Sequence, residues 1–256
     1  MDGSSIYERV KDQLTLAKPT PVTFSVDWFI AALPILHEKS QFDPLFIFKN
    51  WLAHAILLRP VPSLINGESE VETLQPRSDG SDLGAWFSGL MASSPDSYSV
   101  LNSYLTQLMP DLKSIKNPLV GQGSHAMEAQ FSAAGATVSF PFRDLSDGEK
   151  CFIICALVLA ANSAYGPLLC FWDEPDNFLA PSEVAHFIID LRKAFHSAGQ
   201  FIMTSHNIEA IRRFSDDNTF VLHRKDHFAP VGLRLLSELE VHGDLIDTIL
   251  LGELEP

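Results

Sequence analysis

An apolar run that ends in two adjacent carboxylates decides the fold of this chain: residues 168–175 read Leu-Leu-Cys-Phe-Trp-Asp-Glu-Pro. A short uncharged run that follows a turn, here the Gly-Pro pair at 166–167, is typical of a strand buried within a sheet. Asp173 stands at the carboxyl end of this strand, the edge at which such sheets bind ligands. Successive strand residues point to opposite faces, so Glu174 points away from Asp173. The sequence therefore predicts a buried strand over residues 168–173 that presents two acids at one edge.

Two further pieces flank this strand along the chain. Residues 145–150 read Leu-Ser-Asp-Gly-Glu-Lys and open an almost wholly apolar helix, expected from residue 149 to about 162. The backbone N–H groups at such a helix start attract anions. Residues 201–206 read Phe-Ile-Met-Thr-Ser-His and predict a second buried strand that ends in His206. Each piece alone also has an ordinary reading: a helix cap, a solvated strand end and a structural histidine.

Strands and helices alternate around these pieces. The alternation predicts βαβ units and therefore a mostly parallel sheet flanked by helices. The expected helices are 28–34, 45–58, 82–91, 97–109, 182–196, 207–214 and 244–251. The expected strands are 21–26, 200–205, 219–223 and an edge strand at 234–236, with a hairpin in 127–142 that turns at residues 134–135.

Taken in this order, the pieces resemble the second half of an ABC-type ATPase, a group related to SMC and AAA-type ATPases within the P-loop NTPase superfamily. Residues 145–150 resemble the signature, usually written LSGGQ, with Asp147, Glu149 and Lys150 as departures. Residues 168–174 resemble the Walker B strand, 175–179 the D-loop, and His206 the switch histidine. Residues 79–83 also resemble a segment of the helical lobe of stand-alone AAA-type ATPases. The resemblance runs from about residue 30 to the end of the chain and implies an ABC ATPase-like α/β fold with a helical lobe.

The resemblance implies a role for each site residue. Asp173 would hold Mg²⁺, Glu174 would orient and deprotonate the attacking water, and His206 would sense the γ-phosphate of ATP. The D-loop contributes Asp176. The signature would bind the nucleotide of a second, facing subunit, so that a dimer is implied; its residues are Ser146, Asp147, Gly148 and Glu149. Asp147 replaces a glycine there, a departure that many stand-alone relatives share.

The phosphate-binding Walker A loop is missing from the sequence. That loop needs Gly-Lys-Ser/Thr, because the lysine reaches the β- and γ-phosphates, yet none of the 14 glycines is followed by lysine. The glycine-rich residues 121–124 lack the lysine and the strand-loop-helix context, so a flexible turn is expected there. Three explanations stay open: a fragment of a normal ATPase, one half of a split ATPase, or a degenerate partner that presents its signature to an intact subunit.

Three regions are expected along the chain. Residues 1–62 would be an incomplete N-terminal part of the nucleotide lobe with helices. Residues 63–126 would form the helical lobe and a linker, and residues 127–256 the ABC-type ATPase core with its signature, Walker B, D-loop and switch histidine.

Composition excludes several classes. The net charge of −14 does not support direct nucleic-acid binding. Three cysteines in apolar runs, without a fourth ligand nearby, indicate buried thiols rather than a metal site. Residues 151–172 carry no charge, but breaks within the run argue against a membrane span. The first residues lack the apolar core of a secretory signal, and a cytoplasmic location is expected.

The function predicted from the sequence is an ATP-binding and ATP-hydrolysing module that works as a nucleotide-dependent dimer, with ATP and Mg²⁺ as its ligands. Its ATPase activity is uncertain for this chain alone, because the P-loop is missing. Its partner would be a second copy or a P-loop-containing ATPase subunit; a nuclease or DNA-processing effector would have to be a separate partner. The alternative is a non-hydrolysing structural or regulatory partner that donates its signature to an intact subunit.

Overall fold

The computed structural model describes residues 5–16, 21–196, 199–214 and 218–239. It divides into two compact units, Met1–Ala55 and Ile56–Pro256, each of which is described by itself.

The first unit contains a small antiparallel sheet with the strand order β1 (Tyr7–Val10), β2 (Gln13–Leu16) and β3 (Val22–Ser25). Its core contains Leu14, Val26, Ala32, Leu36 and Leu45. Helix α1 (Pro44–Ala53) begins where the side chain of Asp43 accepts a hydrogen bond from the Leu45 N–H at 2.9 Å, with proline at the first helical position. This unit therefore has its own apolar cluster.

Two helix predictions for the first part of the chain are wrong. Residues 28–34 form turns, and only Leu33–Ile35 make one 3-10 turn. The helix expected through residue 58 ends at Ala53, and Ile56–Leu58 form strand β4 instead. The reason is tertiary: β4 pairs in parallel with β10 (Leu169–Trp172), and this pairing overrides the helical spacing of the apolar residues.

A three-stranded parallel sheet, with the order β11–β10–β4, lies at the centre of the second unit. Strand β11 (Gln200–Met203) pairs with β10 so that Trp172 stands opposite Met203, while Leu58 of β4 stands opposite Trp172 on the other side. The three strands therefore end in register. The residues that follow them, Arg59, Asp173 and Thr204, share the carboxyl edge of the sheet.

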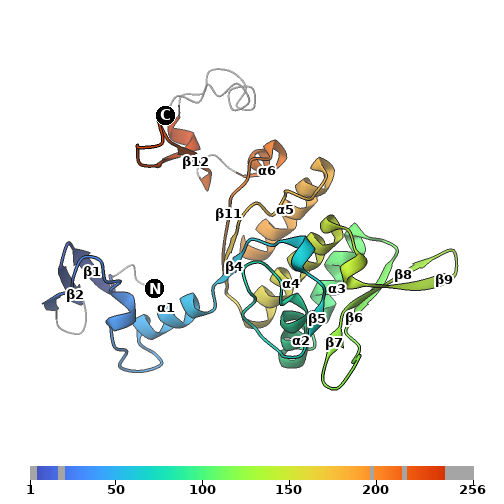
Figure 1. Cartoon of the computed structure of the whole chain (residues 1–256). Coiled ribbons are helices and arrows are strands. Elements are labelled where there is room, and N and C mark those ends of the chain that lie inside the picture. The colour runs from blue at the N-terminus through green and yellow to red at the C-terminus, as the bar shows by residue number, and fades with distance from the viewer. Residues whose placement is uncertain (1–4, 17–20, 197–198, 215–217, 240–256) are drawn as a thin grey trace. The chain divides into compact units, whose positions relative to one another are not determined.

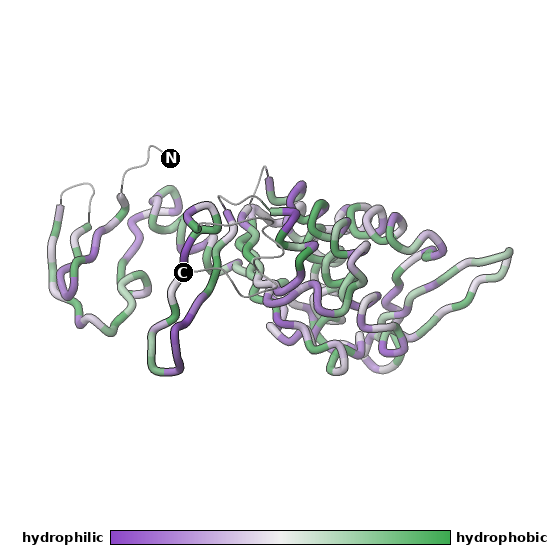
Figure 2. Tube along the Cα trace, turned by 90° about the horizontal axis from the view of Figure 1, so that it is seen from above, coloured by the Kyte–Doolittle hydropathy of each residue, from purple (hydrophilic) through white to green (hydrophobic). Residues whose placement is uncertain are grey.

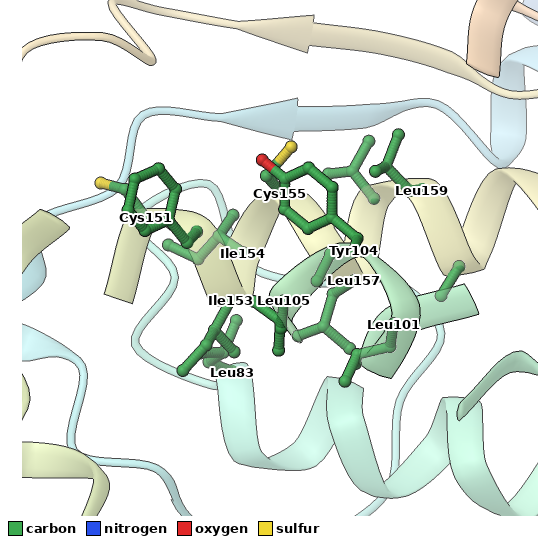
Figure 3. Packing of buried hydrophobic residues seen from close by; sticks show 14 of the residues in the cluster. Leu83, Leu101, Tyr104, Leu105, Cys151, Ile153, Ile154, Cys155, Leu157 and Leu159 are labelled. Atoms are coloured by element: carbon green, nitrogen blue, oxygen red, sulfur yellow. The ribbon is translucent and has the colours of Figure 1, made fainter. Parts of the chain in front are cut away.

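Helix α4 (Asp147–Tyr165) is the core of the second unit. Its residues 150–162 are all buried, and it packs on α3 (Ser97–Leu108) through the side chains shown in Figure 3. The helix is long and apolar enough to cross a membrane, yet 72% of its most apolar window is buried within the fold, as is usual for a core helix. All three cysteines are free and buried, as expected. Burial raises the pKa of the Cys151 and Cys170 thiols to about 12 each.

The other α-helices in the described part of this unit are α2 (Leu83–Ser93), α5 (Pro181–His196) and α6 (Ile208–Arg213), all close to their expected positions. Figure 2 shows hydrophobic stretches alternating with hydrophilic ones along the coiled segments of the chain. Helix α5 buries the stripe Val184, Phe187, Ile188, Leu191 and Phe195. A parallel sheet with covering helices is thus present, and the predicted α/β class is confirmed.

Antiparallel strands complete the unit. Strands β6 (Leu112–Lys116), β8 (Glu128–Ala133) and β9 (Ala136–Pro141) form one sheet, from which the predicted β8–β9 hairpin extends (Figure 1). Its turn residues Ala134 and Gly135 both have positive φ, as a two-residue hairpin turn requires. Strand β5 (Glu68–Ser69) pairs with β7 (His125–Ala126). In the described parts of the unit, 3-10 turns lie at Pro62–Leu64, Phe142–Asp144 and Leu236–Glu238, among others.

The strand expected at 219–223 is present as β12 (Phe220–His223), but it is not part of the parallel sheet. Among the described residues it pairs with β13 (Gly232–Leu235) in an antiparallel ribbon, so the edge strand expected at 234–236 is displaced to a separate sheet. The helix expected at 244–251 lies outside the described residues.

Candidate active site

Backbone hydrogen bonds fix the carboxyl edge of the parallel sheet. The N–H of Asp173 donates to the carbonyl of Leu58 at 2.8 Å, and the N–H of Thr204 donates to the carbonyl of Trp172 at 3.2 Å. Trp172 is fully buried against the ring of Phe187 in α5. The side chains beyond these strand ends therefore project from a rigid base, as a catalytic constellation requires.

Both carboxylate oxygens of Asp173 have partners. Oδ1 accepts a hydrogen bond from Thr204 Oγ1 at 2.5 Å, and Oδ2 lies 3.5 Å from Nε of Arg59. The Arg59 side chain is 81% exposed, and that of Asp173 is 34% exposed. Sequence reasoning missed both Arg59 and Thr204. Arg59 was missed because residues 56–58 were assigned to a helix, so nothing placed Arg59 at a sheet edge.

Glu174 has a left-handed backbone, with φ of 48°, which is uncommon for a residue with a side chain. Its N–H donates to Thr204 Oγ1 at 3.0 Å. Its carboxylate accepts a hydrogen bond from Asn177 Nδ2 at 2.6 Å and lies 3.3 Å from Nε2 of His206. The exposed His206 and the half-exposed Glu174 are thus neighbours, although 31 residues of sequence lie between them.

Asp176, which the sequence predicts as the D-loop acid, is only 4% exposed. Its Oδ2 accepts a hydrogen bond from Ser205 Oγ at 2.7 Å, while Oδ1 has no hydrogen-bond partner within the described parts of the chain. Burial raises the pKa of Asp176 above the ordinary value, and the negative charge of Glu174 adds to this rise. The Ser205 hydrogen bond and the nearby His206 oppose the rise in pKa.

The predicted signature turn, residues 146–149, forms hydrogen bonds within itself. Ser146 caps helix α4, because its Oγ accepts a hydrogen bond from the Glu149 N–H at 3.3 Å. Glu149 Oε2 in return accepts from both the N–H and the Oγ of Ser146, each at 2.7 Å. Asp147 lies in the same first turn. In the described residues, no hydrogen bond or ion pair links residues 146–149 to Asp173, Glu174 or His206.

The signature turn and the D-loop are nevertheless close in space. A Cβ added to Gly148 would lie 3.1 Å from the carbonyl oxygen of Phe178, so the glycine allows the two segments to approach each other. Lys150, on the same helix, is 5% exposed and donates to the carbonyl of Pro62 at 3.1 Å. This bond ties the helix start to the segment that follows β4.

The acids at the edge suit Mg²⁺ in one respect only. Mg²⁺ at phosphate sites is held by one or two carboxylates, with waters and phosphate oxygens completing the shell. Asp173 supplies one such carboxylate. Among the described residues, no cluster of three or more His, Cys, Asp or Glu side chains could hold a metal by itself. Asp173 therefore fits a metal ion whose remaining ligands come from water and nucleotide phosphates.

Two cavities of this unit are lined by residues other than Asp173, Glu174 and His206. One of about 930 Å³ is lined by residues of α3, α4 and α5 and contains none of the predicted site residues. Another, of about 420 Å³, lies against the β8–β9 hairpin and includes Glu149. Neither cavity includes the acid edge, the group formed by Asp173, Glu174, Asp176 and His206.

Comparison with known proteins gives one family match. Residues 131–212 match the model of a family described as "AAA domain, putative AbiEii toxin, Type IV TA system", and this segment contains every residue predicted for the site. No curated protein matches the chain. The match supports an AAA-type ATPase domain within residues 131–212, and the family model covers less than half of the chain.

Solved structures of SMC ATPase heads resemble the chain at low identity. One, described as "Structural biochemistry of ATP-driven dimerization and DNA stimulated activation of SMC ATPases", is 18% identical with a TM-score of 0.43; the match covers 63% of this chain and 95% of that one. The Smc head of Pyrococcus furiosus bound to the C-terminal domain of ScpA is 16% identical, with a TM-score of 0.45 and 70% and 44% coverage. The SMC head of Thermotoga maritima is 17% identical, with a TM-score of 0.38 and 56% and 49% coverage. At these identities the likeness concerns the fold alone.

Proposed function

We propose that this chain is the signature-bearing part of an ABC/SMC-like ATPase that binds and hydrolyses ATP as a nucleotide-dependent dimer. The observation that carries the proposal is the convergence of Asp173, Glu174 and His206 at one edge of a parallel sheet. The two acids differ in their surroundings: Asp173 is held by Thr204 and Arg59, whereas Glu174 faces an exposed histidine.

Each residue has a role that its position suits. Mg²⁺ would neutralise charge on the β- and γ-phosphates. Asp173 offers a fixed carboxylate to that ion once Arg59 moves from Oδ2. Glu174 accepts the proton of the attacking water, and its contact with His206 and Asn177 holds the carboxylate for this step. His206, which is 93% exposed, is free to reach the γ-phosphate.

The signature acts across the dimer in this proposal. Ser146 and the first N–H groups of α4 bind the γ-phosphate held by the facing subunit. Phe178, two residues after Asp176 in the predicted D-loop, lies against Gly148 of this helix. Because Glu149 occupies the Ser146 hydroxyl here, its carboxylate must release Ser146 before an anionic phosphate approaches. The missing Walker A loop is supplied by another polypeptide or another part of a longer chain.

We also propose a division of the chain into three parts. Residues 1–62 would be an incomplete N-terminal part of the nucleotide lobe, residues 63–126 the helical lobe and linker, and residues 127–256 the ATPase core. We further propose a cytoplasmic location.

A second candidate is a non-hydrolysing partner that donates its signature to an intact ATPase subunit. Arg59 beside Asp173 favours it, because a guanidinium already compensates the metal carboxylate. The absence of any Gly-Lys pair in the sequence points the same way.

Calorimetry with Mg-ATP tests both candidates. The chain is titrated alone and then with a P-loop-containing ATPase subunit of the same class. The proposal expects no binding alone and ATP-dependent association in the mixture, which Ser146→Arg abolishes. ATP hydrolysis in the mixture that requires Glu174 identifies the first candidate, and association without Glu174-dependent hydrolysis identifies the second. Tight ATP binding by the chain alone contradicts the missing Walker A loop, and no association in any mixture contradicts both candidates.

A further inference from the structure

One hydroxyl group connects the two edge acids. Thr204 follows β11 directly and is half-buried. Its Oγ1 donates to Asp173 Oδ1 at 2.5 Å and accepts from the backbone N–H of Glu174 at 3.0 Å. A hydroxyl can do both at once, because it has one donor and two acceptor lone pairs. Thr204 therefore contacts the side chain of one acid and the backbone of the next.

The second of these bonds acts where the backbone is strained. A residue with a Cβ at φ of 48° pays a conformational cost, and such a conformation persists only when surrounding contacts hold it. The Thr204 hydroxyl accepts the Glu174 N–H and so provides such a contact. From this backbone the Glu174 carboxylate reaches His206 and Asn177. Without it, φ is free to return to the negative region, which redirects the side chain.

The first bond orients the neighbouring carboxylate. With Oδ1 of Asp173 engaged by Thr204, Oδ2 is the oxygen that faces the positive charge of Arg59. Outer hydrogen bonds of this kind fix the orientation of carboxylates that bind metal ions. The same hydroxyl thus determines which oxygen of Asp173 is presented at the edge.

We propose that Thr204 is a positioning residue that holds Asp173 and Glu174 in the arrangement that the ATPase reaction needs. The role of Thr204 in catalysis rests on the function proposed above. Its positioning of Asp173 and Glu174 does not depend on nucleotide. Thr204 itself touches no reacting atom. Ser205, the next residue, performs a separate task, since its hydroxyl binds Asp176.

Amide hydrogen exchange and NMR on the chain alone test the structural part. In the wild type we expect the Glu174 amide to be protected and an NOE to join the side chains of Glu174 and His206. Thr204→Val removes the hydroxyl and keeps the branched shape; we expect Glu174 exchange to be about tenfold faster, the equivalent of one hydrogen bond. The NOE is lost as well. Thr204→Ser keeps the hydroxyl and restores both signals, and Thr137→Val in the exposed hairpin is the matched control that leaves them unchanged.

The proposal is overturned if the wild-type Glu174 amide exchanges freely, a result that needs no variant. It is also overturned if Thr204→Val keeps the protection and the NOE, or if Thr204→Ser loses them. Should the valine variant not fold, Thr204→Ala gives the same comparison without steric change beyond deletion. If Thr204 contributed only to stability, Thr204→Val would lower the free energy of unfolding but leave the Glu174–His206 contact intact, which would overturn the positioning role.

The catalytic part is measured in the reconstituted dimer. Thr204→Val lowers kcat about tenfold to a hundredfold with little change in KM, because ground-state binding of ATP does not use Thr204. Thr204→Ser recovers kcat. If wild-type dimers do not hydrolyse ATP, the proposed function fails while the exchange result for Thr204 stands; if they hydrolyse it and Thr204→Val has full kcat, the positioning role in catalysis fails alone.

Discussion

The acid edge and the signature turn are built in opposite ways. At the edge, the side chains of Asp173, Glu174 and Asp176 contact residues 204–206, which follow a different strand, β11. At the signature turn, Ser146 and Glu149 bind each other within one helical turn. The edge is thus arranged by tertiary structure, and the turn by local sequence.

This difference has a consequence for function. The edge is organised before any ligand arrives, since its donors and acceptors are already aligned by the sheet. The turn has used its own hydroxyl in a capping box, which is a stabilising local motif but also occupies the group that a phosphate would need. In the proposed dimer, the nucleotide of the facing subunit would have to displace Glu149 from Ser146, whereas a metal ion at Asp173 would have to displace Arg59.

The largest effect is expected at the edge. Glu174→Gln removes the proposed general base and lowers ATP hydrolysis by about 10²- to 10⁴-fold, while ATP-dependent association with the partner persists. Steady-state phosphate release and size-exclusion chromatography measure the two quantities. Glu72→Gln, an exposed acid, is the control and leaves both unchanged. Full hydrolysis by Glu174→Gln would remove the acid edge from the mechanism.

The second prediction concerns the hydrogen bond between Ser205 and the buried carboxylate of Asp176. Ser205→Ala removes the hydrogen bond from Ser205 to the buried Asp176 carboxylate, at a cost of about 1–3 kcal/mol in the free energy of unfolding at neutral pH. The pKa of Asp176 is raised in the folded state, so its contribution to stability is full below the ordinary value of 3.8 and falls as pH rises through the raised pKa.

Loss of the Ser205 hydroxyl raises the pKa of Asp176 further, because that hydrogen bond favours the charged form. The destabilisation by Ser205→Ala is therefore larger at neutral pH than at about pH 4. Urea unfolding at the two pH values measures the difference, with Ser132→Ala in the exposed hairpin as control. An equal cost at both pH values would show that Asp176 does not titrate as its burial implies.

Features that depend on local sequence could be predicted from the sequence, whereas those that depend on pairing between distant segments could not. The local features were predictable: the cap at Ser146, the strand that ends at Asp173, and the hairpin turn at Ala134. Strand β4 was not, because its three residues follow a helix closely and their apolar spacing fits that helix. Pairing with β10 decides its conformation, and pairing is a property of two distant segments.

The same reason explains which site residues were missed. Asp173, Glu174 and His206 carry distinctive chemistry at strand ends, so the sequence pointed to them. Thr204 is an ordinary threonine until the register of β10 with β11 brings it against Asp173, and Arg59 is an ordinary arginine until β4 is placed. Strand β12 shows the converse: its alternation was visible, but not that it pairs with β13.

The signature turn should respond to local changes by a smaller amount. Ser146→Ala removes the cap of α4 and lowers the free energy of unfolding by about 1 kcal/mol. Ser146→Thr keeps a capping hydroxyl and should lie close to the wild type. Thermal unfolding followed by circular dichroism measures both variants. A loss well above 2 kcal/mol would mean that Ser146 makes contacts beyond its own helical turn.

The smallest effect is expected at Arg59, and it distinguishes a structural ion pair from a functional one. The Arg59 side chain is 81% exposed and its Nε lies 3.5 Å from Asp173 Oδ2, so solvent screens the pair and Arg59→Gln should change the free energy of unfolding by less than about 1 kcal/mol. Added salt should reduce even that difference. Arg77→Gln, outside the edge, is the control. A cost of several kcal/mol, insensitive to salt, would show that Arg59 is a structural counterion of Asp173. In that case the guanidinium would not leave for a metal ion, and the non-hydrolysing alternative would be favoured over the ATPase.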